Sequence, residues 1–468
     1  MDTPICDFVN KYIDSDFSRF HMPGHKGKAF IGCERQDITE IDGADVLSHA
    51  DGIIKKSQEN AAKLFGSGAS FYSTEGSSQC IKTMLAAVFM DYKIRQEQKS
   101  SESTKSSTKP FVLAARNVHK SMIDAIALLD LSVEFMYPKD ADSICVSMVT
   151  PDDVKNELEK EQKPMAVYIT SPDYLGNTAD IKGISRVCEE YDIPLIVDNA
   201  HGAYQAFLDE KKYGTVHPIK SGAAICCDSA HKTLPVLTGG AYIHVSKKYR
   251  ERLAHHIASY MTIFGSTSPS YLIMQSLDMC NRYLAGKFRY ELADCIKRME
   301  KTKAVLAENN VSLMKTEPLK IVIDTAAAGL EGDELADELR RYKIECEYAD
   351  KYFVVLMITP QNDDKDFERL EKWASDTKDF RNKKGKLVPK KLVLSKAERV
   401  IGIREAFFSP YEKVRVFDAC GRICASQTIA CPPAIPIAVC GERIDENMIE
   451  IFEEYAIEYI NVVDNRYV

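Results

Sequence analysis

The sequence has no apolar run of the roughly 18 residues that a membrane-spanning helix needs. Its first residues, MDTPICDFVNKYIDSDF, are acidic and lack the basic-then-apolar order of a secretion signal. The net charge of −8 at pH 7 disfavours a nucleic-acid partner bound through its phosphates. These features predict a cytoplasmic globular protein that binds neither membranes nor nucleic acids.

Several motifs of cofactor and metal binding are also missing. No GxGxxG follows a strand pattern and no GxxxxGK[ST] occurs, so dinucleotide and P-loop sites are disfavoured. The fourteen cysteines include no CxxC pair, and the chain has no HExxH, so neither a metal centre nor a disulfide framework is indicated. We expect reduced, mostly buried cysteines.

The chain has 468 residues, which is long enough for several domains, and it contains no internal repeat. Residues 1–60 show turn signals but little periodicity, and we expect them to be irregular. Polar stretches over 96–109 and 380–391 are expected to be exposed connectors. The predicted segments are an N-terminal arm (1–60), a large cofactor-binding domain (61–260), a small α/β segment (261–385) and a C-terminal domain (386–468).

Short apolar runs alternate with helical patterns between about residues 60 and 245. Such alternation predicts an α/β fold, a mostly parallel sheet with helices on both faces. The strand patterns are FVLAA, SVEFMYP, PMAVYIT, IPLIVD, GAAICCD and AYIHV, and the main helix patterns are QENAAKLFG and GSSQCIKTMLAAVFMDYKIR.

Polar residues follow several of these strand patterns. Ligands of open α/β sheets bind at the carboxyl ends of the strands, so these residues are site candidates. They are Arg116, Asn117, His119 and Lys120; Ser171 and Tyr174; Asp198, Asn199 and His201; Asp228, Ser229, His231 and Lys232; and, before a helix, Glu75, Gly76, Ser77 and Ser78.

Pyridoxal phosphate (PLP) is a ligand that needs such a set of groups. Its aldehyde requires a lysine amine, its pyridine nitrogen a carboxylate, and its phosphate the N–H groups and hydroxyls of a helix N-terminus. Lys232, Asp198 and the turn Gly76-Ser77-Ser78 supply these groups, and His119 offers a flat ring. Each has an ordinary alternative as a surface lysine, a helix cap or a core histidine. The four together favour a PLP site.

Several segments resemble those of a known family, in the same order along the chain. They are RFHMPGHKGKAF, DITEIDGADVL, AAKLFGSGASF, RNVHKSMIDA, ITSPDYLGN, DNAHGAY, SAHKTLPVLTGGAYIH and ACGRICASQTIACPPAIPIAVCGERI. They resemble the Orn/Lys/Arg decarboxylase family of fold-type I PLP enzymes, in its short form without the N-terminal wing domain. The resemblance implies an aspartate aminotransferase-like fold, a smaller α+β C-terminal domain and a homodimer or higher homo-oligomer.

The resemblance also implies a role for each site residue. Lys232 would form the Schiff base with PLP, Asp198 would pair with the pyridinium nitrogen, and His119 would stack on the ring. His231 or Lys232 would return a proton to the substrate's Cα. Contacts with the phosphate or the ring are implied for Gly76, Ser77, Ser78, Ser229, His231, Ala200 and His201.

The reaction that the resemblance implies is decarboxylation of a basic amino acid. Arginine, giving agmatine and CO2 for polyamine biosynthesis, is the first candidate, and lysine and ornithine are the alternatives. The substrate's distal cation needs a carboxylate, for which Glu442 is the first choice and Asp173 and Glu75 are further candidates. The alternative for Glu442 is a glutamate at a helix N-terminus.

Two other kinds of function stay open. An aminotransferase or lyase on this fold would need an arginine late in the chain to bind the substrate carboxylate, and Arg404 or Arg422 could serve. A catalytically silent regulatory homologue would keep the fold without turnover. The positions that depart from residues common in the family are Asn199, Tyr204, Glu75, Cys431 and Cys440, and they bear on substrate choice and rate more than on cofactor binding.

Overall fold

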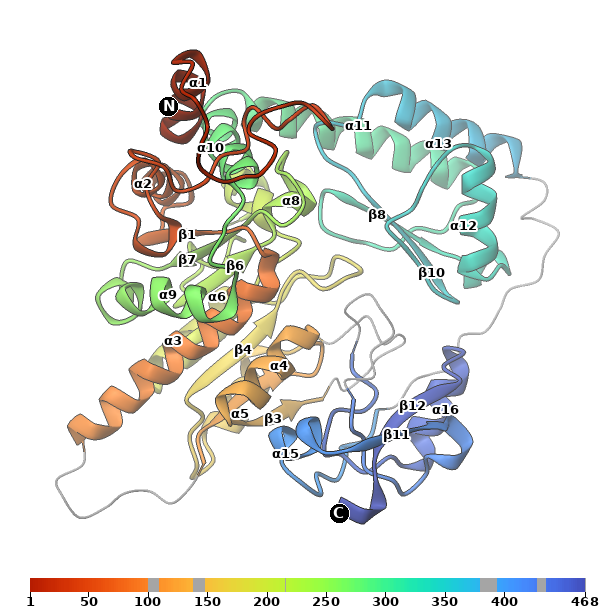
Figure 1. The fold of residues 1–468 in the computed structure, drawn as a ribbon. Coiled ribbons are helices and arrows are strands. Elements are labelled where there is room, and N and C mark those ends of the chain that lie inside the picture. The colour runs from red at the N-terminus through yellow and green to blue at the C-terminus, as the bar shows by residue number, and fades with distance from the viewer. Residues whose placement is uncertain (100–108, 138–147, 215, 379–393, 427–434, 468) are drawn as a thin grey trace. The chain divides into compact units, whose positions relative to one another are not determined.

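The computed structural model describes residues 1–99, 109–137, 148–214, 216–378, 394–426 and 435–467 (Figure 1). Two compact units make up the chain, and the boundary between them falls inside strand β2 (Phe111–Ala115). Unit 1 comprises Met1–Leu113, Thr150–Ser171 and Asp180–Arg289, and unit 2 comprises Ala114–Val149, Pro172–Ala179 and Tyr290–Val468.

The main sheet has seven strands in the order β1-β7-β6-β5-β4-β2-β3. β4, β5 and β6 run parallel, whereas β7 is antiparallel to both β6 and β1. The predicted α/β class and its mostly parallel sheet are thereby confirmed, with an antiparallel edge. The bounds are β1 Ala69–Ser73, β2 Phe111–Ala115, β3 Ser132–Met136, β4 Ala166–Thr170, β5 Leu195–Asp198, β6 Ile225–Asp228 and β7 Ala241–Val245.

Strand β1 is absent from the sequence prediction. Its residues, ASFYS, are small or polar at three of five positions and do not form the β-branched run that marks a buried strand. Its pairing depends on Gly68, whose backbone N–H donates to Val245 O at 2.7 Å. A Cβ at Gly68 would lie 2.8 Å from the Cα of Lys247, so only glycine permits this approach.

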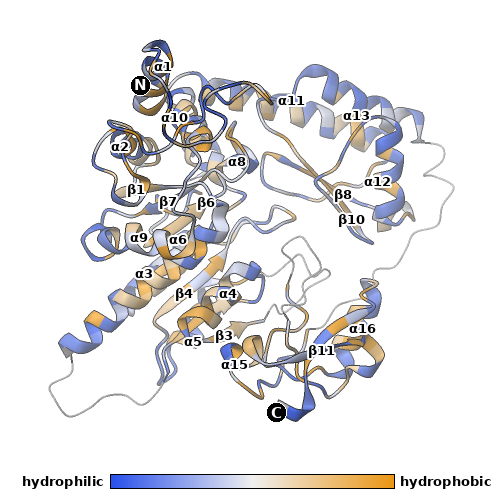
Figure 2. Cartoon of the chain, viewed as in Figure 1, coloured by the Kyte–Doolittle hydropathy of each residue, from blue (hydrophilic) through white to orange (hydrophobic). Residues whose placement is uncertain are grey.

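Helix α3 (Gly76–Lys99) packs on β1, β5, β6 and β7 and against α9 (Arg250–Phe264). Residues 84–88 of α3 are buried on every side, whereas its last turns, IRQEQK, are polar. Figure 2 shows this change along α3 from apolar to hydrophilic. The other helices of unit 1 are α2 Ile53–Phe65, α5 Pro151–Leu158, α6 Ile181–Glu190, α7 Glu210–Tyr213, α8 Ala230–Thr233 and α10 Tyr271–Ala285.

The expectation that residues 1–60 are irregular is wrong at both ends, because α2 begins at Ile53 and α1 spans Pro4–Asp14. Proline in the first turn costs no hydrogen bond, and Ile5 and Val9 bury their side chains completely. Asp278 of α10 accepts hydrogen bonds from the backbone N–H groups of Ile5 and Cys6 at 3.0 and 3.1 Å. A carboxylate distant in sequence therefore caps this helix, which explains why the local pattern was weak.

Unit 2 contains two smaller sheets, one with the order β8-β10-β9 and one pairing β11 with β12. A buried cluster that includes Tyr174, Val322, Phe353, Ile437 and Phe452 joins segments from the middle and the end of the chain. The four predicted segments stay a prediction. The bounds in unit 2 are α4 Lys120–Leu129, α11 Phe288–Glu308 (which begins in unit 1), β8 Lys320–Asp324, α12 Gly332–Arg341, β9 Tyr348–Ala349, β10 Phe353–Met357, α13 Asp364–Asp376, α15 Ile403–Phe408, β11 Tyr411–Arg415, α16 Glu446–Glu454 and β12 Tyr459–Val463.

Part of what the sequence predicts lies outside the described residues. The connector 380–391 and most of the stretch 96–109 are among these residues, as is Cys431. The twelve cysteines in the described ranges are all free thiols, and most are buried. Among the described helices, none combines the length and the apolar character that a membrane span requires.

Candidate active site

Asp198 is the last residue of β5 and only 2% of its surface is exposed. Its carboxylate accepts hydrogen bonds from Ala200 N–H at 3.1 Å and from Tyr168 Oη–H at 3.3 Å, and the Cys227 thiol lies 3.6 Å from Oδ1. Tyr168 and Cys227 were not singled out from the sequence, because each sits inside an apolar strand pattern. Their position beside a carboxylate follows from the parallel register of β4, β5 and β6.

Lys232 lies on the short helix α8, which begins two residues after the end of β6. The lysine is half-buried, and its Nζ is 2.9 Å from Nε2 of His201, which is itself buried just after β5. The chain turns here because Lys232 N–H donates to Ser229 O and His231 N–H donates to Gly240 O. The polar ends of β5 and β6 therefore meet, as the sequence predicts for neighbouring parallel strands.

The turn Gly76-Ser77-Ser78 opens α3 in the same unit. Gly76 has φ +70°, and its N–H donates to Gly239 O at 2.8 Å. Gly239 has φ +95°, and a Cβ there would lie 2.9 Å from Thr74 O, so glycine is required at this contact. The first N–H groups of an α-helix have no acceptor within the helix, and α3 is long enough to carry a macrodipole that favours an anion at this end.

One further observation indicates that the residues of unit 1 fit PLP. Ser229 is buried, and its Oγ has no hydrogen-bond partner among the described residues. A buried hydroxyl without a partner costs free energy, which an acceptor such as a phosphate oxygen would recover. Ala200 is buried beside Asp198, and His231 is half-buried with its Nδ1 3.0 Å from Gly240 O.

His119 belongs to unit 2, where it precedes α4 as its N-cap. Its Nδ1 accepts hydrogen bonds from the Ser121 N–H at 3.2 Å and lies 3.0 Å from the Ser121 Oγ. The ring is half-buried. These contacts fix the orientation of the imidazole, and its stacking on the cofactor stays a prediction.

Glu442 is also in unit 2 and is almost fully buried. Its two carboxylate oxygens accept from the Arg116 guanidinium, at 2.7 Å each, and Oε2 also accepts from Val439 N–H at 2.8 Å. Burial acts to raise the pKa of Glu442, but the charge of Arg116 holds that pKa below its ordinary value. The carboxylate is thus engaged by the chain itself. It is not the helix cap that was the alternative, because Asp445 fills that position before α16.

The other two substrate carboxylates differ in exposure. Asp173 is buried in unit 2 and accepts hydrogen bonds from the backbone N–H and the side-chain Nδ2 of Asn177, each at 2.8 Å. Burial raises the pKa of Asp173 to about 6. Glu75 is exposed next to the Gly76 turn and accepts a hydrogen bond from Ser266 N–H at 3.2 Å.

The two arginines offered for an aminotransferase have partners within unit 2. Arg404 donates to the carbonyls of Ala127 and Leu128 at the end of α4. Arg422 contacts Glu412 and donates to Val463 O. Both arginines therefore hold pieces of unit 2 together, which weakens their case as substrate-carboxylate ligands.

A family model described as "Orn/Lys/Arg decarboxylase, major domain" matches residues 3–326. The chain belongs to the Orn/Lys/Arg decarboxylase family. It is accordingly an amino-acid decarboxylase of a PLP-dependent family, as the motifs around Lys232 and Asp198 predict.

Among curated proteins, arginine decarboxylase of Bacillus subtilis (strain 168) is 28% identical over 481 residues, covering 97% of this chain and 93% of the relative. The constitutive lysine decarboxylase of Escherichia coli (strain K12) is 26% identical over 319 residues, 60% of this chain and 40% of that protein. Among solved structures, the Francisella novicida lysine decarboxylase LdcF superposes with a TM-score of 0.77 at 18% identity, over 99% of this chain and 81% of that one. The last comparison confirms the predicted fold.

Proposed function

We propose that this protein decarboxylates a basic amino acid with PLP, and that the substrate is L-arginine, which gives agmatine and CO2. The observation that carries the proposal is the placement of Asp198 at the end of β5 and of Lys232 on α8, just after the neighbouring strand β6, with His201 in contact with the lysine amine. Full-length similarity to proteins named arginine decarboxylase supports arginine over lysine and ornithine. A place in polyamine biosynthesis and in the cytoplasm belongs to the same proposal.

Each side chain then has a definite task. Bound PLP would withdraw electrons from the substrate's Cα as CO2 leaves. Lys232 Nζ would hold the cofactor, and Asp198 would keep a proton on its ring nitrogen. Ser77, Ser78 and Ser229 would bind the phosphate. His201, 2.9 Å from Lys232 Nζ, is placed to accept or return a proton at that amine, and Lys232 or His231 would protonate Cα.

Substrate choice depends on a carboxylate for the distal cation. Glu442 and Asp173 are both buried and use their oxygens on Arg116 and Asn177. Glu75 is exposed and sits beside the turn proposed for the phosphate, so its case is the strongest of the three. A planar guanidinium can bind a carboxylate through two hydrogen bonds, whereas an ammonium offers a point charge. Glu75→Gln should therefore raise KM for arginine more than for lysine.

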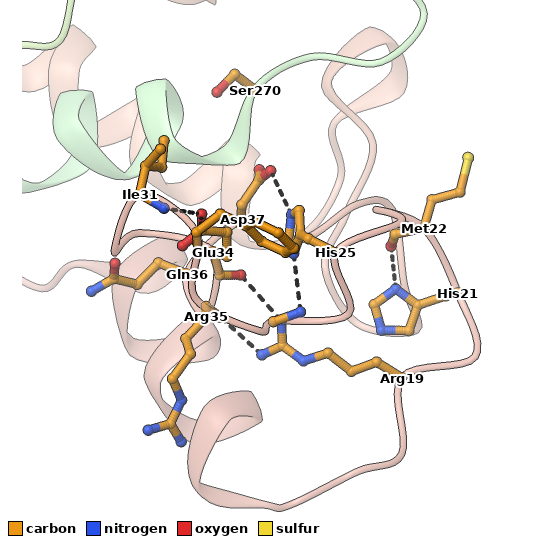
Figure 3. Close-up of polar contacts among 12 residues, drawn as sticks. Arg19, His21, Met22, His25, Ile31, Glu34, Arg35, Gln36, Asp37 and Ser270 are labelled. Carbon is orange, nitrogen blue, oxygen red and sulfur yellow. Dashed lines mark hydrogen bonds and ion pairs between the residues drawn. The ribbon is translucent and has the colours of Figure 1, made fainter.

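The smallest active unit in this proposal is a homodimer to which the N-terminal arm contributes. Within the arm, residues 15–45 make several polar contacts with one another, as Figure 3 shows for Arg19, His25 and Glu34. Arg19 donates to the carbonyls of Glu34 and Arg35, and the Glu34 carboxylate accepts from the N–H groups of Ile31, Phe30 and Gly32. The N–H of Ile31 above all lowers the pKa of Glu34 to about 2.

Several large apolar side chains of this arm are exposed to solvent, although Ile38 is buried. Exposed fractions are 70% for Phe17, 95% for Phe20, 83% for Phe30 and 86% for Ile31. Several large apolar side chains exposed on one segment are typical of an interaction surface. A second copy of this chain is the proposed partner.

The direct test is an assay of the purified protein with PLP and a panel of amino acids, scored by the amine formed and the CO2 released. We expect arginine to have the highest kcat/KM. Best activity on lysine or ornithine would change the substrate and keep the chemistry. An oxo-acid product, or no turnover of any basic amino acid, would overturn the proposal.

A further inference from the structure

A second buried carboxylate, Asp228, ends the strand next to that of Asp198. Asp228 is fully buried, and its Oδ1 accepts a hydrogen bond from Asn199 Nδ2 at 2.6 Å. His217 Nε2 donates to Oδ2 at 3.1 Å, and Nε2 of His244 lies 3.3 Å from the same oxygen, off the line of a good hydrogen bond. Four fully buried side chains from four segments of unit 1 thus meet at one point.

The ionised Asp228 can only accept, so it favours the ring tautomer of His244 that carries its proton on Nε2. His244 Nδ1 is 2.7 Å from Ser70 Oγ, which is in turn 2.8 Å from Ser67 Oγ. With the Ser70 hydroxyl donating to Nδ1, the proton of His244 lies on Nε2 and faces Asp228. The Phe65 ring stacks on the imidazole, with centroids 4.2 Å apart. Residues of unit 1 therefore set both the charge of the cluster and the orientation of its side chains.

The protonation states follow from burial and these contacts. Burial acts to raise the pKa of Asp228, but His217 and His244 together hold that pKa well below its ordinary value. Burial lowers the pKa of His244, so this ring is neutral at pH 7. Asp228 is consequently an anion that the chain satisfies by its own donors, whereas the donors to Asp198 are one backbone N–H, a phenol at 3.3 Å and a weak thiol.

The chain links the two carboxylates directly. Asn199, which binds Asp228, follows Asp198, and its backbone N–H also donates to Cys227 O at 3.0 Å. Asp228 itself precedes Ser229, and Lys232 follows one turn later. Movement of Asp228 would therefore displace both turns that carry the proposed cofactor residues.

We propose that Asp228, with Asn199, His217 and His244, is a positioning network that holds the turns after β5 and β6 in the geometry that binds PLP. The inference rests on the proposed function and assigns residues that would not touch the cofactor. One buried, multiply bonded anion at a strand end is a rigid anchor because each of its donors comes from a different segment.

A divalent cation is the competing occupant of this cluster. One ligand atom from each of His217, Asp228 and His244 lies within 4.8 Å of the others, which suits a metal ion. Aligned hydrogen bonds from His217 and Asn199 already occupy both carboxylate oxygens, however. Asp228 is therefore satisfied without a cation, whereas His217 Nδ1 and His244 Nε2 have no hydrogen-bond partner among the described residues. Metal analysis of the purified protein decides between the two occupants.

The experiment compares Asp228→Asn and Ser70→Ala with a matched pair on α10 and α2, Asp278→Asn and Ser57→Ala. Asp278 is equally buried and accepts hydrogen bonds from Ser57 and the start of α1. Apo proteins are titrated with PLP and followed by cofactor absorbance and visible circular dichroism. We expect PLP affinity to fall about tenfold or more in Asp228→Asn, the loss typical of a charged hydrogen bond.

Ser70→Ala removes less from the network than Asp228→Asn, and it should lower PLP affinity by a smaller factor. Ser70→Ala should weaken PLP binding about twofold to fivefold, as loss of one neutral hydrogen bond does, and combining it with Asp228→Asn should give less than the product of the two effects. The matched pair should lower the melting temperature and leave PLP affinity within about twofold. If Asp228→Asn does not fold, Ser70→Ala and its matched control decide.

Three results would overturn the network. Unchanged PLP affinity in folded Asp228→Asn, or in Ser70→Ala, would leave the cluster a core contact only. Equal losses in the matched pair would show a general stability effect. Stoichiometric metal that is lost in His217→Gln would make the cluster a metal site. Failure of the wild-type protein to bind PLP would instead contradict the proposed function. PLP binding by the wild type is therefore measured before the variants are compared.

Discussion

Two carboxylates at the ends of adjacent strands show how partners decide the role of a residue. Asp198 and Asp228 have the same side chain and nearly the same burial. Asp228 is paired with amide and imidazole donors of its own chain, and Asp198 has weaker donors and so retains capacity for a ligand cation. Burial of an ion without a strong partner is costly, and a protonated ring nitrogen would supply that partner.

Replacement of Lys232 tests the covalent attachment of the cofactor. Lys232→Ala should abolish the visible absorbance of bound PLP and all turnover, because the Lys232 amine lies 2.9 Å from His201, just after the strand end that carries Asp198. Absorbance spectra, an amine-product assay and circular dichroism are the measurements. Lys248→Ala, at an exposed ion pair with Glu189, is the control and should behave as wild type. An unaltered cofactor spectrum in Lys232→Ala would refute the assignment.

Replacement of Asp198 tests the partner of the ring nitrogen. Asp198→Asn should still bind PLP but lose about 100-fold or more in kcat, since a close charge pair at an effective dielectric near 20 contributes about 4 kcal/mol. Titration with PLP and steady-state kinetics separate the two effects. Near-normal kcat in this variant would mean that another group protonates the ring.

Asp173 should make stability depend on pH in an unusual direction. Its pKa of about 6 lies above the ordinary value of 3.8, so its stabilising contribution is complete below pH 4 and is lost as the pH rises through 6. The shift corresponds to on the order of 3 kcal/mol. The melting temperature of wild type, measured relative to that of Asp173→Asn, should therefore fall as the pH rises from 4 to 7.5. A difference independent of pH would contradict this assignment.

At the scale of elements, six strands of the main sheet and their polar ends were predictable, whereas β1 and α1 were not. β2 to β7 follow the apolar runs of the sequence, because all of them except the edge strand β3 are buried on both faces. β1 and α1 were missed, since each is fixed by a distant partner: Val245 O for the first and Asp278 for the second. The local periodicity of the sequence cannot indicate partners that lie far away along the chain.

The ion pair of Arg116 and Glu442 joins the end of β2 to the C-terminal segment. Glu442→Gln should destabilise the protein by about 3–5 kcal/mol, because it leaves a buried guanidinium without its charge partner. Arg443, which pairs with Glu398 at the surface, gives the control Arg443→Gln with little effect on stability. Urea denaturation measures both.

The same variant tests the predicted substrate role of Glu442. If Glu442 binds the distal cation, Glu442→Gln should raise KM for arginine or lysine far more than it weakens PLP binding, under conditions where the protein stays folded. A fully stable variant with a raised KM would support the substrate role. An unstable variant with unchanged KM would assign Glu442 to the fold alone.

At the scale of the whole molecule, the exposed apolar arm predicts self-association. Phe20→Ser combined with Phe30→Ser should convert a homodimer to monomers and remove activity, since both rings are almost fully exposed in the single chain. Phe417→Ser, at a ring 71% exposed in unit 2, is the control. Sedimentation analysis and the amine assay are the measurements. A wild-type monomer with full activity would contradict the proposed dimer.

The sequence by itself determined the fold class, the family and the residues that stand at the strand ends. These depend on apolar runs, turn residues and motifs, which are local properties of the chain. Only the tertiary structure decided which acid meets which base. Glu442 lies 326 positions from Arg116 and Asp228 lies 29 positions from Asn199, yet each pair shares hydrogen bonds. Such pairings arise from the packing of distant segments, and they separate carboxylates engaged by the chain from those available to a ligand.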